Sequence, residues 1–148
     1  HLLLVSSAYG TGSRAIELRQ SDGKTTVNER WALNRVRVHI GTIIWVGDTA
    51  YMSSGDFGPA FLSAVNTTTG ALLWQDRAFA RAQFLYADGK LIVLDEDGVL
   101  GLATVSPKGL TVLARTQILE HRAWTPPTLV GTTLYVPDRH TIAAYDLS

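Results

Sequence analysis

The stretch LSAVNTTTGALLWQ, residues 62–75, decides the fold of this chain. Apolar and small residues precede a polar segment that ends at Gly70, and a second apolar run follows it. Two such runs separated by turn residues predict two short β-strands joined by a tight turn. Trp74 comes four residues after Gly70, on the second strand. The stretch therefore predicts a hairpin that carries an indole, and a repeat of it would set the whole fold.

A repeat is present. Gly47, Gly89 and Gly131 are 42 residues apart, and each comes before a short apolar strand. The three stretches are VGDTAYM (46–52), ADGKLIV (87–93) and VGTTLYV (130–136). A second landmark, a strand with small residues in its middle, occurs in RAIELR (14–19), FLSAVN (61–66), VLGLAT (99–104) and TIAAYD (141–146). The chain therefore contains four related units.

Each unit has the size and pattern of one β-propeller blade. Alternating hydrophobicity and Gly, Asp and Asn turns predict about four short strands in about 40–45 residues, which is typical of a blade. The strands are expected near residues 2–7, 13–19, 25–31, 39–46, 49–54, 60–66, 71–76, 82–87, 90–94, 99–105, 110–115, 125–130, 133–136 and 141–146. The expected fold class is thus all-β, a β-propeller of four-stranded antiparallel blades, with about four blades in this chain.

The first and last units are expected to be incomplete. The first lacks its innermost strand and the last lacks its outermost strand. The whole chain, 1–148, is expected to be a single partial β-propeller whose blade-like units span about 1–38, 39–78, 79–118 and 119–148.

Composition limits the function classes. Thirteen Lys and Arg residues balance thirteen Asp and Glu residues, so no net field attracts nucleic acid or an anionic membrane. The chain has no cysteine, which excludes disulfides and thiolate metal sites. The apolar run at the start, in HLLLVSS, is too short for a signal-peptide core or a transmembrane segment. We expect the chain to be part of a longer polypeptide.

The hairpin of the opening stretch resembles a known family motif. AVNTTTGALLW is similar to the tryptophan-docking motif Ala-x-Asp-x-x-Thr-Gly-x-x-x-Trp of the pyrroloquinoline-quinone-like (PQQ-like, quinoprotein-type) propeller family. Ala64, Thr69, Gly70 and Trp74 match it, and Asn66 stands where Asp is usual. The resemblance implies that an outer-strand tryptophan packs between neighbouring blades and that the Thr-Gly turn bonds across to it.

The other units carry degraded copies. The last keeps AYD (144–146), the third has ATVSPKG with Leu113 near the tryptophan place, and the first has Trp31, expected to be displaced by an insertion. Residues 87–148 are also similar to the C-terminal end of bacterial PQQ-like repeat proteins that resemble the propeller lipoprotein of outer-membrane protein assembly. Such proteins usually close eight blades, so the resemblance implies roughly half of a ring in the periplasm or another extracytoplasmic space.

Half of a ring leaves sheet edges open at both ends. The partners expected there are the remaining blades, another copy of the chain, or a different protein.

Three arginines occupy equivalent places before the expected inner strands. Arg37, Arg81 and Arg122 lie ten, eight and nine residues before the landmark glycines. The residues two positions further on are His39, Gln83 and Trp124, which would share one side of an extended strand. We expect the arginines to form an arc of positive charge that binds a carboxylate, a phosphate or an acidic peptide. The alternative is that they bond to carbonyls of a neighbouring blade or face solvent.

The sequence offers little for catalysis. Quinoprotein dehydrogenases of the resembled fold hold PQQ between a tryptophan and a vicinal disulfide, beside calcium and a catalytic Asp. This chain has no cysteine and no matching Asp and Asn constellation, so we expect no catalytic residue, no metal site and no cofactor. His1, His39, His121 and His140 show no pair at metal-ligand spacing.

Three function classes remain. A non-catalytic scaffold or binding module of the bacterial cell envelope, which engages protein or peptide partners, fits best. A fragment of a PQQ-dependent dehydrogenase, with calcium, is the enzymatic alternative. A small-ligand or carbohydrate-binding sensor, with Trp45, Tyr51 and Trp124 as stacking surfaces, is the third.

Overall fold

The computed structural model describes all 148 residues and confirms the all-β class, with fourteen strands and no helix. No helix that could cross a membrane is therefore found. The strands are β1 (Leu2–Ser7), β2 (Gly12–Ser21), β3 (Lys24–Leu33), β4 (Ile44–Val46), β5 (Thr49–Ser54), β6 (Phe61–Asn66), β7 (Leu72–Asp76), β8 (Ala82–Ala87), β9 (Lys90–Asp95), β10 (Val99–Ser106), β11 (Gly109–Gln117), β12 (Thr128–Val130), β13 (Thr133–Pro137) and β14 (Ile142–Asp146).

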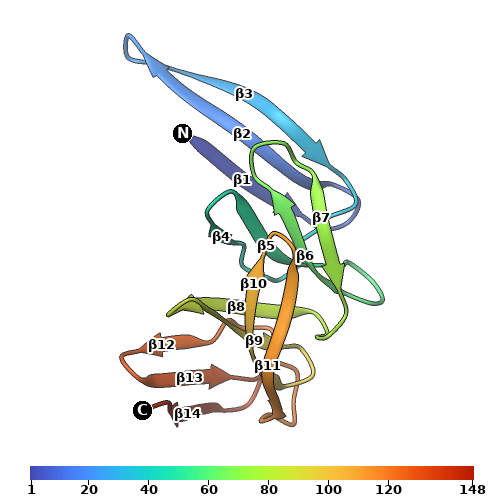
Figure 1. Cartoon of the computed structure of the whole chain (residues 1–148), viewed down its shortest axis with the longest axis vertical. Helices are drawn as coiled ribbons and strands as arrows, with labels where there is room; N and C mark the ends of the chain where they lie inside the picture. The colour runs from blue at the N-terminus through green and yellow to red at the C-terminus, as the bar shows by residue number, and fades with distance from the viewer.

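The strands form four antiparallel sheets in chain order, each a meander (Figure 1). The first sheet is β1-β2-β3, the second β4-β5-β6-β7, the third β8-β9-β10-β11 and the fourth β12-β13-β14. Gly47, Gly89 and Gly131 occupy the same turn of the second, third and fourth sheets, with φ of +56°, +71° and +58°. Glycine adopts this left-handed conformation without steric cost, which explains the period of the sequence.

The two three-stranded sheets are incomplete in the way the sequence predicts. Ser6 of β1 accepts a hydrogen bond at Oγ from the backbone N–H of Val38 (3.0 Å), and Ser53 of β5 accepts one from Ala82 (2.9 Å). β1 thus corresponds to β5, so the first sheet has no counterpart of β4. The fourth sheet has counterparts of β4, β5 and β6 but none of β7.

Two of the predicted strands are too long. Residues 39–43 and 125–127 are irregular, and regular pairing starts only at β4 and β12. The backbone of 39–43 bonds to the next sheet instead of to β5: the Ile40 carbonyl accepts a hydrogen bond from Gln83. A Cβ on Gly41 would lie 3.1 Å from the Ala82 carbonyl oxygen, which shows how closely the two segments approach.

The apolar core is divided among the three junctions between neighbouring sheets. One buried cluster lies at each: Val36, Val38, Ala50, Met52 and Val65 between the first and second sheets; Leu62, Phe79, Ala82, Phe84, Leu91 and Val93 between the second and third; Ile92, Leu94, Leu119, Ala123, Leu134 and Val136 between the third and fourth. Each sheet is therefore stabilised by packing against its neighbours in the chain.

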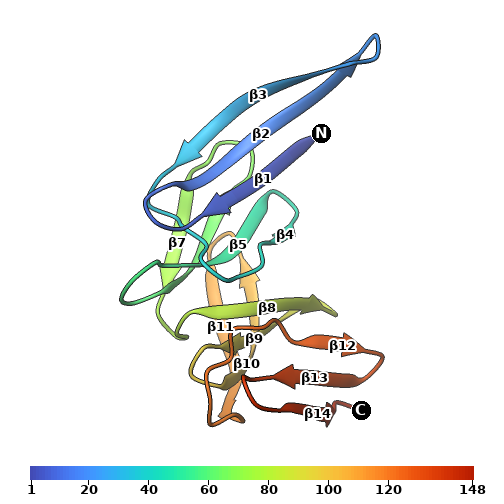
Figure 2. The same cartoon turned by 180° about the vertical axis from the view of Figure 1, so that it is seen from behind.

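The sheets converge at one side. β8 contacts both β4 and β5 of the preceding sheet. The outer strands β7 and β11 stand at the front in Figure 1, whereas the inner strands β4 and β8 stand at the front in the reverse view of Figure 2. This fan of consecutive meanders is the arrangement of propeller blades.

An indole crosses each of the first two junctions. Trp31 of β3 donates a hydrogen bond from Nε1 to the Thr67 carbonyl in the second sheet (2.8 Å). Trp74 of β7 donates one to the Ser106 carbonyl in the third (2.9 Å). Trp31 also lies against Gly70, where a Cβ would come within 2.7 Å of the ring. In both cases the indole packs on the next sheet at the turn between its last two strands, β6–β7 for Trp31 and β10–β11 for Trp74.

Trp31 is not displaced in the sheet, contrary to the expectation. It pairs with Ala15 next to a β-bulge, just as Trp74 pairs with Ala64 next to a β-bulge. The longer β2–β3 hairpin projects beyond this point, so its extra residues leave the position of the indole unchanged (Figure 1).

The third sheet has no indole at this place. It has the same bulge, but its turn pairs Ser106 with Gly109, so Ala114 pairs with Leu102 and Leu113 is the unpaired residue of the bulge. Leu113 is half exposed. Ala114, and not Leu113, therefore holds the position of the tryptophan.

Asn66 fills the role of the usual Asp in its turn. Its Oδ1 accepts hydrogen bonds from the backbone N–H of Thr68 (3.1 Å) and Thr69 (2.9 Å) and from the Thr69 hydroxyl (2.9 Å). Such local bonds fix a tight turn. They hold Gly70 where Trp31 packs on it.

Replacing Gly70 with Ala should destabilise the chain more than the same change at Gly131. Both glycines have positive φ, which costs an alanine about 1–2 kcal/mol. Gly131 has open space around its Cβ position, whereas Gly70 faces the Trp31 ring. We expect Gly70→Ala to cost about 2–5 kcal/mol, because overpacking adds about 1–3 kcal/mol to the cost of the backbone conformation. Urea unfolding of both variants measures the difference, and the excess should disappear in a Trp31→Ala background. Equal costs for Gly70→Ala and Gly131→Ala would contradict the contact.

Candidate functional site

One side of the molecule gathers the segments that connect successive sheets and the central turn of each sheet. The Gly55 N–H donates to the Arg37 carbonyl (2.9 Å), Glu96 to Arg81 (2.7 Å), and Ala123 to Glu96 (3.2 Å). These bonds join the connections 34–43, 77–81 and 118–127 to the turns 55–60 and 96–98. We call this surface, together with the turns 8–11 and 138–141, the loop face; it lies on the right in Figure 1.

Arg37 is paired within the chain. Its Nη1 lies 2.8 Å from Oδ2 of Asp56, and its Nε donates to the Asn34 carbonyl (2.9 Å). The same carboxylate oxygen accepts the backbone N–H of Tyr9 from the first sheet (3.0 Å). Asp56 thus holds the β1–β2 turn against the second sheet.

Arg81 is the most enclosed of the three arginines. Both carboxylate oxygens of Glu96 lie 3.1 Å from its Nη1. Its Nε and Nη2 donate to the carbonyls of Gly55 (3.2 Å) and Asp56 (2.8 Å) in the preceding sheet. The side chain of Arg81 is 11% exposed and that of Glu96 is 12% exposed. Arg81 therefore links two sheets.

Arg122 is the most accessible of the three. It pairs with Glu96 (3.1 Å) and Asp97 (3.2 Å), and its side chain is 52% exposed. The Trp124 indole also donates to Glu96, at 3.0 Å. Arg139 of the fourth sheet stacks over the Trp124 ring, 4.4 Å from its centroid. Glu96 is thus the common partner of side chains from two connections, Arg81 before the third sheet and Arg122 and Trp124 before the fourth.

Two carboxyl groups of this region have pKa values shifted in opposite directions. Burial disfavours the charge of Asp56, but the hydrogen bond and the charge of Arg37, with backbone donors from Gly10 and Tyr9, outweigh it and lower its pKa. Burial dominates at Asp95 and raises its pKa, although backbone N–H groups of Val99, Ala80 and Asp97 donate to it. Asp56 is therefore held in its charged form by the arginine.

The six residues predicted from the sequence as a binding site all lie on the loop face, but their contacts differ. Arg37, Arg81 and Arg122 each have a carboxylate partner, and Arg81 also bonds to carbonyls of a neighbouring sheet, as the alternative interpretation supposed. His39 and Trp124 lie in irregular segments, so only Gln83 is on a strand. Alternation along an extended strand was the wrong reason to group these residues.

Gln83 is buried, and its side chain bonds only to backbone carbonyls of this chain. Its amide donates to the carbonyls of Ile40 and Trp124 and so joins the connections on either side of β8. His39 exchanges a hydrogen bond with the Tyr9 hydroxyl through Nε2 (2.7 Å), while its Nδ1 is buried without a partner. The Oδ1 atom of Asp56 is buried and unpartnered as well.

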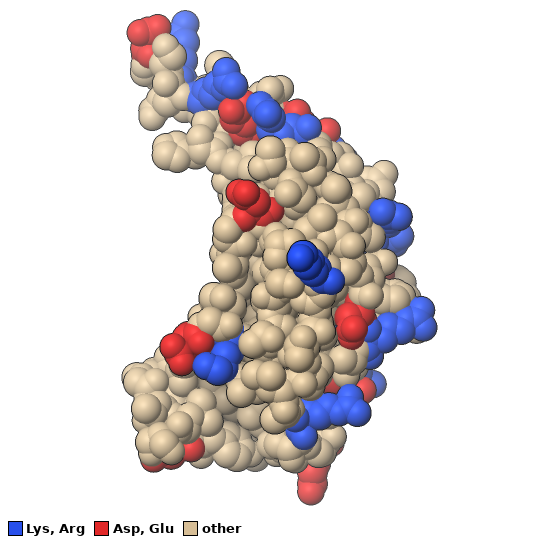
Figure 3. Space-filling model, in the orientation of Figure 1, with Lys and Arg blue, Asp and Glu red and all other residues tan.

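A shallow cavity of about 460 Å³ lies between the second, third and fourth sheets on the loop face. Its lining combines charge and aromatic surface: Asp56, Phe57, Gly58, Arg81, Glu96, Arg122, Trp124 and Arg139. Basic side chains gather along the corresponding edge of the space-filling view (Figure 3). The exposed sides of Arg122 and Arg139 can receive an acidic group there, and Trp124 and Phe57 offer flat apolar surface.

The sequence alone missed several of these residues. Asp56, Glu96, Tyr9, Phe57 and Arg139 all sit in turns that the repeat left unassigned. The signal available was an acidic residue one or two positions after the second strand of a unit, in SSGD (53–56) and LDE (94–96).

A histidine of the connection 118–127 also lies next to a histidine of the turn 138–141. The rings of His121 and His140 lie 4.4 Å apart. No group of three or more His, Asp or Glu residues is arranged to hold a metal ion.

Comparison with known proteins bears on the fold. No protein-family model matches the chain, and no curated protein matches it. It is similar to the crystal structure of BamB from Moraxella catarrhalis, with a TM-score of 0.59 and 18% sequence identity. The fold is that of a β-propeller. The similarity covers 91% of this chain and 37% of the BamB chain. The computationally designed Ika8 protein matches with a TM-score of only 0.40 and 8% identity, over 98% of this chain and 68% of that one.

The loop face predicts unequal effects for two arginine variants of the propeller. Arg81→Gln leaves an enclosed Glu96 without its main partner and should cost about 3 kcal/mol of unfolding free energy. Arg122→Gln removes a half-exposed pair and should cost less than about 1 kcal/mol. Denaturant unfolding of both purified variants measures these values. If Arg81→Gln were as mild as Arg122→Gln, Arg81 would not link the sheets.

Proposed function

We propose that the chain is part of a non-catalytic β-propeller binding module of the bacterial cell envelope, which engages a protein or peptide partner through the loop face. One observation carries the proposal: aromatic side chains stand exposed around the paired charges of this face. The similarity to BamB supports the scaffold class through the fold, and the envelope location is part of the proposal.

The exposed aromatic residues are Tyr9, Phe57 and Trp124, which are 66%, 82% and 43% exposed. Tyr9 connects them to the site, because its ring lies 5.6 Å from Phe57 and 5.2 Å from His39. Protein interfaces are enriched in aromatic residues and arginine, and such residues dominate binding energy. The rings are also held in place: the Trp124 indole by Glu96 and the Tyr9 backbone by Asp56.

The charges of the loop face favour a partner with acidic groups. Arg139 has no carboxylate within salt-bridge distance, and Arg122 shares one of its two carboxylates, that of Glu96, with Arg81 and Trp124. A carboxylate of the partner can therefore bind beside Trp124, where the ring excludes water from one side. Arg37 and Arg81 would hold the surrounding loops in shape.

A photocrosslinking amino acid placed at Phe57 in living bacteria tests the proposal. Crosslinking at this position and at Trp124 should give an adduct with an envelope protein, since both side chains would contact the partner. Val27, which is 67% exposed on the β2–β3 hairpin away from the loop face, is the matched control and should give none. Phe57→Ala should then weaken binding of the purified partner by about ten-fold or more.

Three results would contradict this function. The first is the absence of any adduct specific to Phe57 and Trp124. The second is a bound-cofactor spectrum on addition of PQQ and calcium, which would favour the dehydrogenase alternative; the proposal itself includes no cofactor. The third is specific binding of a sugar or another small ligand at Trp124 without any protein partner, which would favour the sensor alternative.

We also propose that the chain belongs to a larger, eight-bladed ring, built from the blade-like units 1–38, 39–78, 79–118 and 119–148 and from further blades. Side chains alternate across a sheet, so Leu4 and Leu134 face the junctions and their neighbours face outward. The outward faces of the first and fourth sheets expose Leu3, Val5, Val130, Tyr135 and Ile142. Apolar faces of this kind are suited to packing against another sheet.

The 148-residue chain on its own should therefore self-associate. Sedimentation velocity should show a mass that rises with concentration, because the outward apolar faces pair with those of another copy. Leu3→Lys combined with Ile142→Lys should shift the chain towards monomer, while Val27→Lys on the projecting hairpin should not. A stably folded monomer at all concentrations would refute the need for a cover on these faces.

A further inference from the structure

The third junction between sheets differs from the other two in one register position. In each of the first three sheets, three cross-strand neighbours face the next sheet: Leu4, Ala15 and Trp31; Tyr51, Ala64 and Trp74; Ile92, Leu102 and Ala114. The outermost residue is a tryptophan in the first two sheets, Trp31 and Trp74, and an alanine, Ala114, in the third. Leu102 in place of the small alanine restores only part of the missing bulk.

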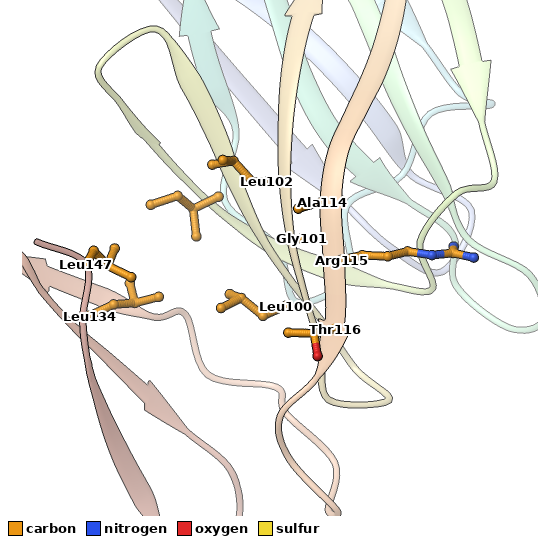
Figure 4. Close-up of a pocket in the computed structure, with 9 residues that line it drawn as sticks. Leu100, Gly101, Leu102, Ala114, Arg115, Thr116, Leu134 and Leu147 are labelled. Atoms are coloured by element: carbon orange, nitrogen blue, oxygen red, sulfur yellow. The ribbon is translucent and has the colours of Figure 1, made fainter.

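A cavity of about 390 Å³ lies at this position. It is lined by Ile92, Leu100, Gly101, Leu102, Ala114, Arg115, Thr116, Leu134 and Leu147. Figure 4 shows Leu100, Leu102 and Ala114 on one side and Leu134 and Leu147 on the other. The Arg115 side chain points away and donates to the Ala78 carbonyl (3.2 Å), so no charge enters the cavity.

The fourth sheet forms one wall of the cavity, and it contains a carbonyl group equivalent to the one that accepts an indole N–H at the first junction. The acceptors at the first two junctions are the carbonyls of Thr67 and Ser106. The N–H of Thr67 donates to the Asp48 carbonyl (2.9 Å), and the N–H of Leu147 donates to the Thr132 carbonyl (2.8 Å) in the same way. Asp48 and Thr132 each follow a landmark glycine, Gly47 and Gly131. Leu147 therefore corresponds to Thr67, and its carbonyl corresponds to the acceptor.

We propose that this cavity is a binding site for an indole ring supplied from outside these sheets. The apolar walls take the flat ring, and the Leu147 carbonyl accepts its N–H, as the Thr67 carbonyl does for Trp31. Pockets of about 300–1,000 Å³ with apolar lining and a few polar groups are typical of small-ligand sites. The site is separate from the loop face and does not depend on the function proposed for that face.

Isothermal titration of the 148-residue chain with free indole tests the site. We expect saturable binding of one indole per chain. Benzofuran, which has the same shape without the N–H donor, should bind about five-fold to ten-fold more weakly, because it leaves the carbonyl unpaired. Ala114→Trp should abolish indole binding and raise the melting temperature, since its own ring fills the cavity. Leu113→Trp, one residue away in the exposed bulge, is the matched control and should leave binding unchanged.

Three outcomes would overturn the proposal: no saturable binding up to the solubility of indole, binding that survives Ala114→Trp, or equal loss with Leu113→Trp. If Ala114→Trp does not fold, Ala114→Leu fills part of the cavity and should weaken binding by about ten-fold. A peptide with a single tryptophan distinguishes the source of the ring. Competition with indole indicates a side chain of another polypeptide, and its absence indicates a small molecule; both results require the site.

Discussion

The contact of the Trp31 indole in the first sheet with the Gly70 turn of the second is the interaction on which the rest of the structure depends. Neighbouring sheets share no backbone ladder, so their relative position must come from side chains. Trp31 fixes it with three elements at once: a flat ring on Gly70, an N–H donated to Thr67, and a β-bulge that turns the ring towards the junction. Asn66 keeps the receiving turn in shape. The positions of the connecting loops follow from this contact.

Much of the fold could be predicted from the sequence, because its signals are local. A glycine with positive φ in the same turn of three sheets leaves a visible period, and alternation reveals the strands between the turns. The register of the third hairpin could not be predicted: the motif spacing places Leu113 at the tryptophan position, but the pairing of Ser106 with Gly109 brings Ala114 there, one residue further on. Such a shift depends on how two strands meet, and neither strand records it alone.

The candidate site was predicted only in part, for a similar reason. The three arginines recur in equivalent places, and all of them lie on the loop face. Their charge is compensated by Asp56, Glu96 and Asp97, which come from turns 15 to 19 residues away in two of the three pairs. A recurrent basic residue therefore indicated where sheets are joined. The exposed rings of Phe57 and Trp124 do not recur, and the partner contact that we propose for this face rests on them.

The division of the core into three clusters has a consequence for how the molecule loses its structure. A protein with one continuous hydrophobic core unfolds cooperatively. Sheets that contact only their neighbours can unfold one after another, as repeats do in solenoid proteins. The junction between the third and fourth sheets contains a cavity at the position that Trp31 and Trp74 fill in the first two junctions. The fourth sheet should therefore be the first to detach on heating, while the sheets joined through Trp31 and Trp74 stay together longer.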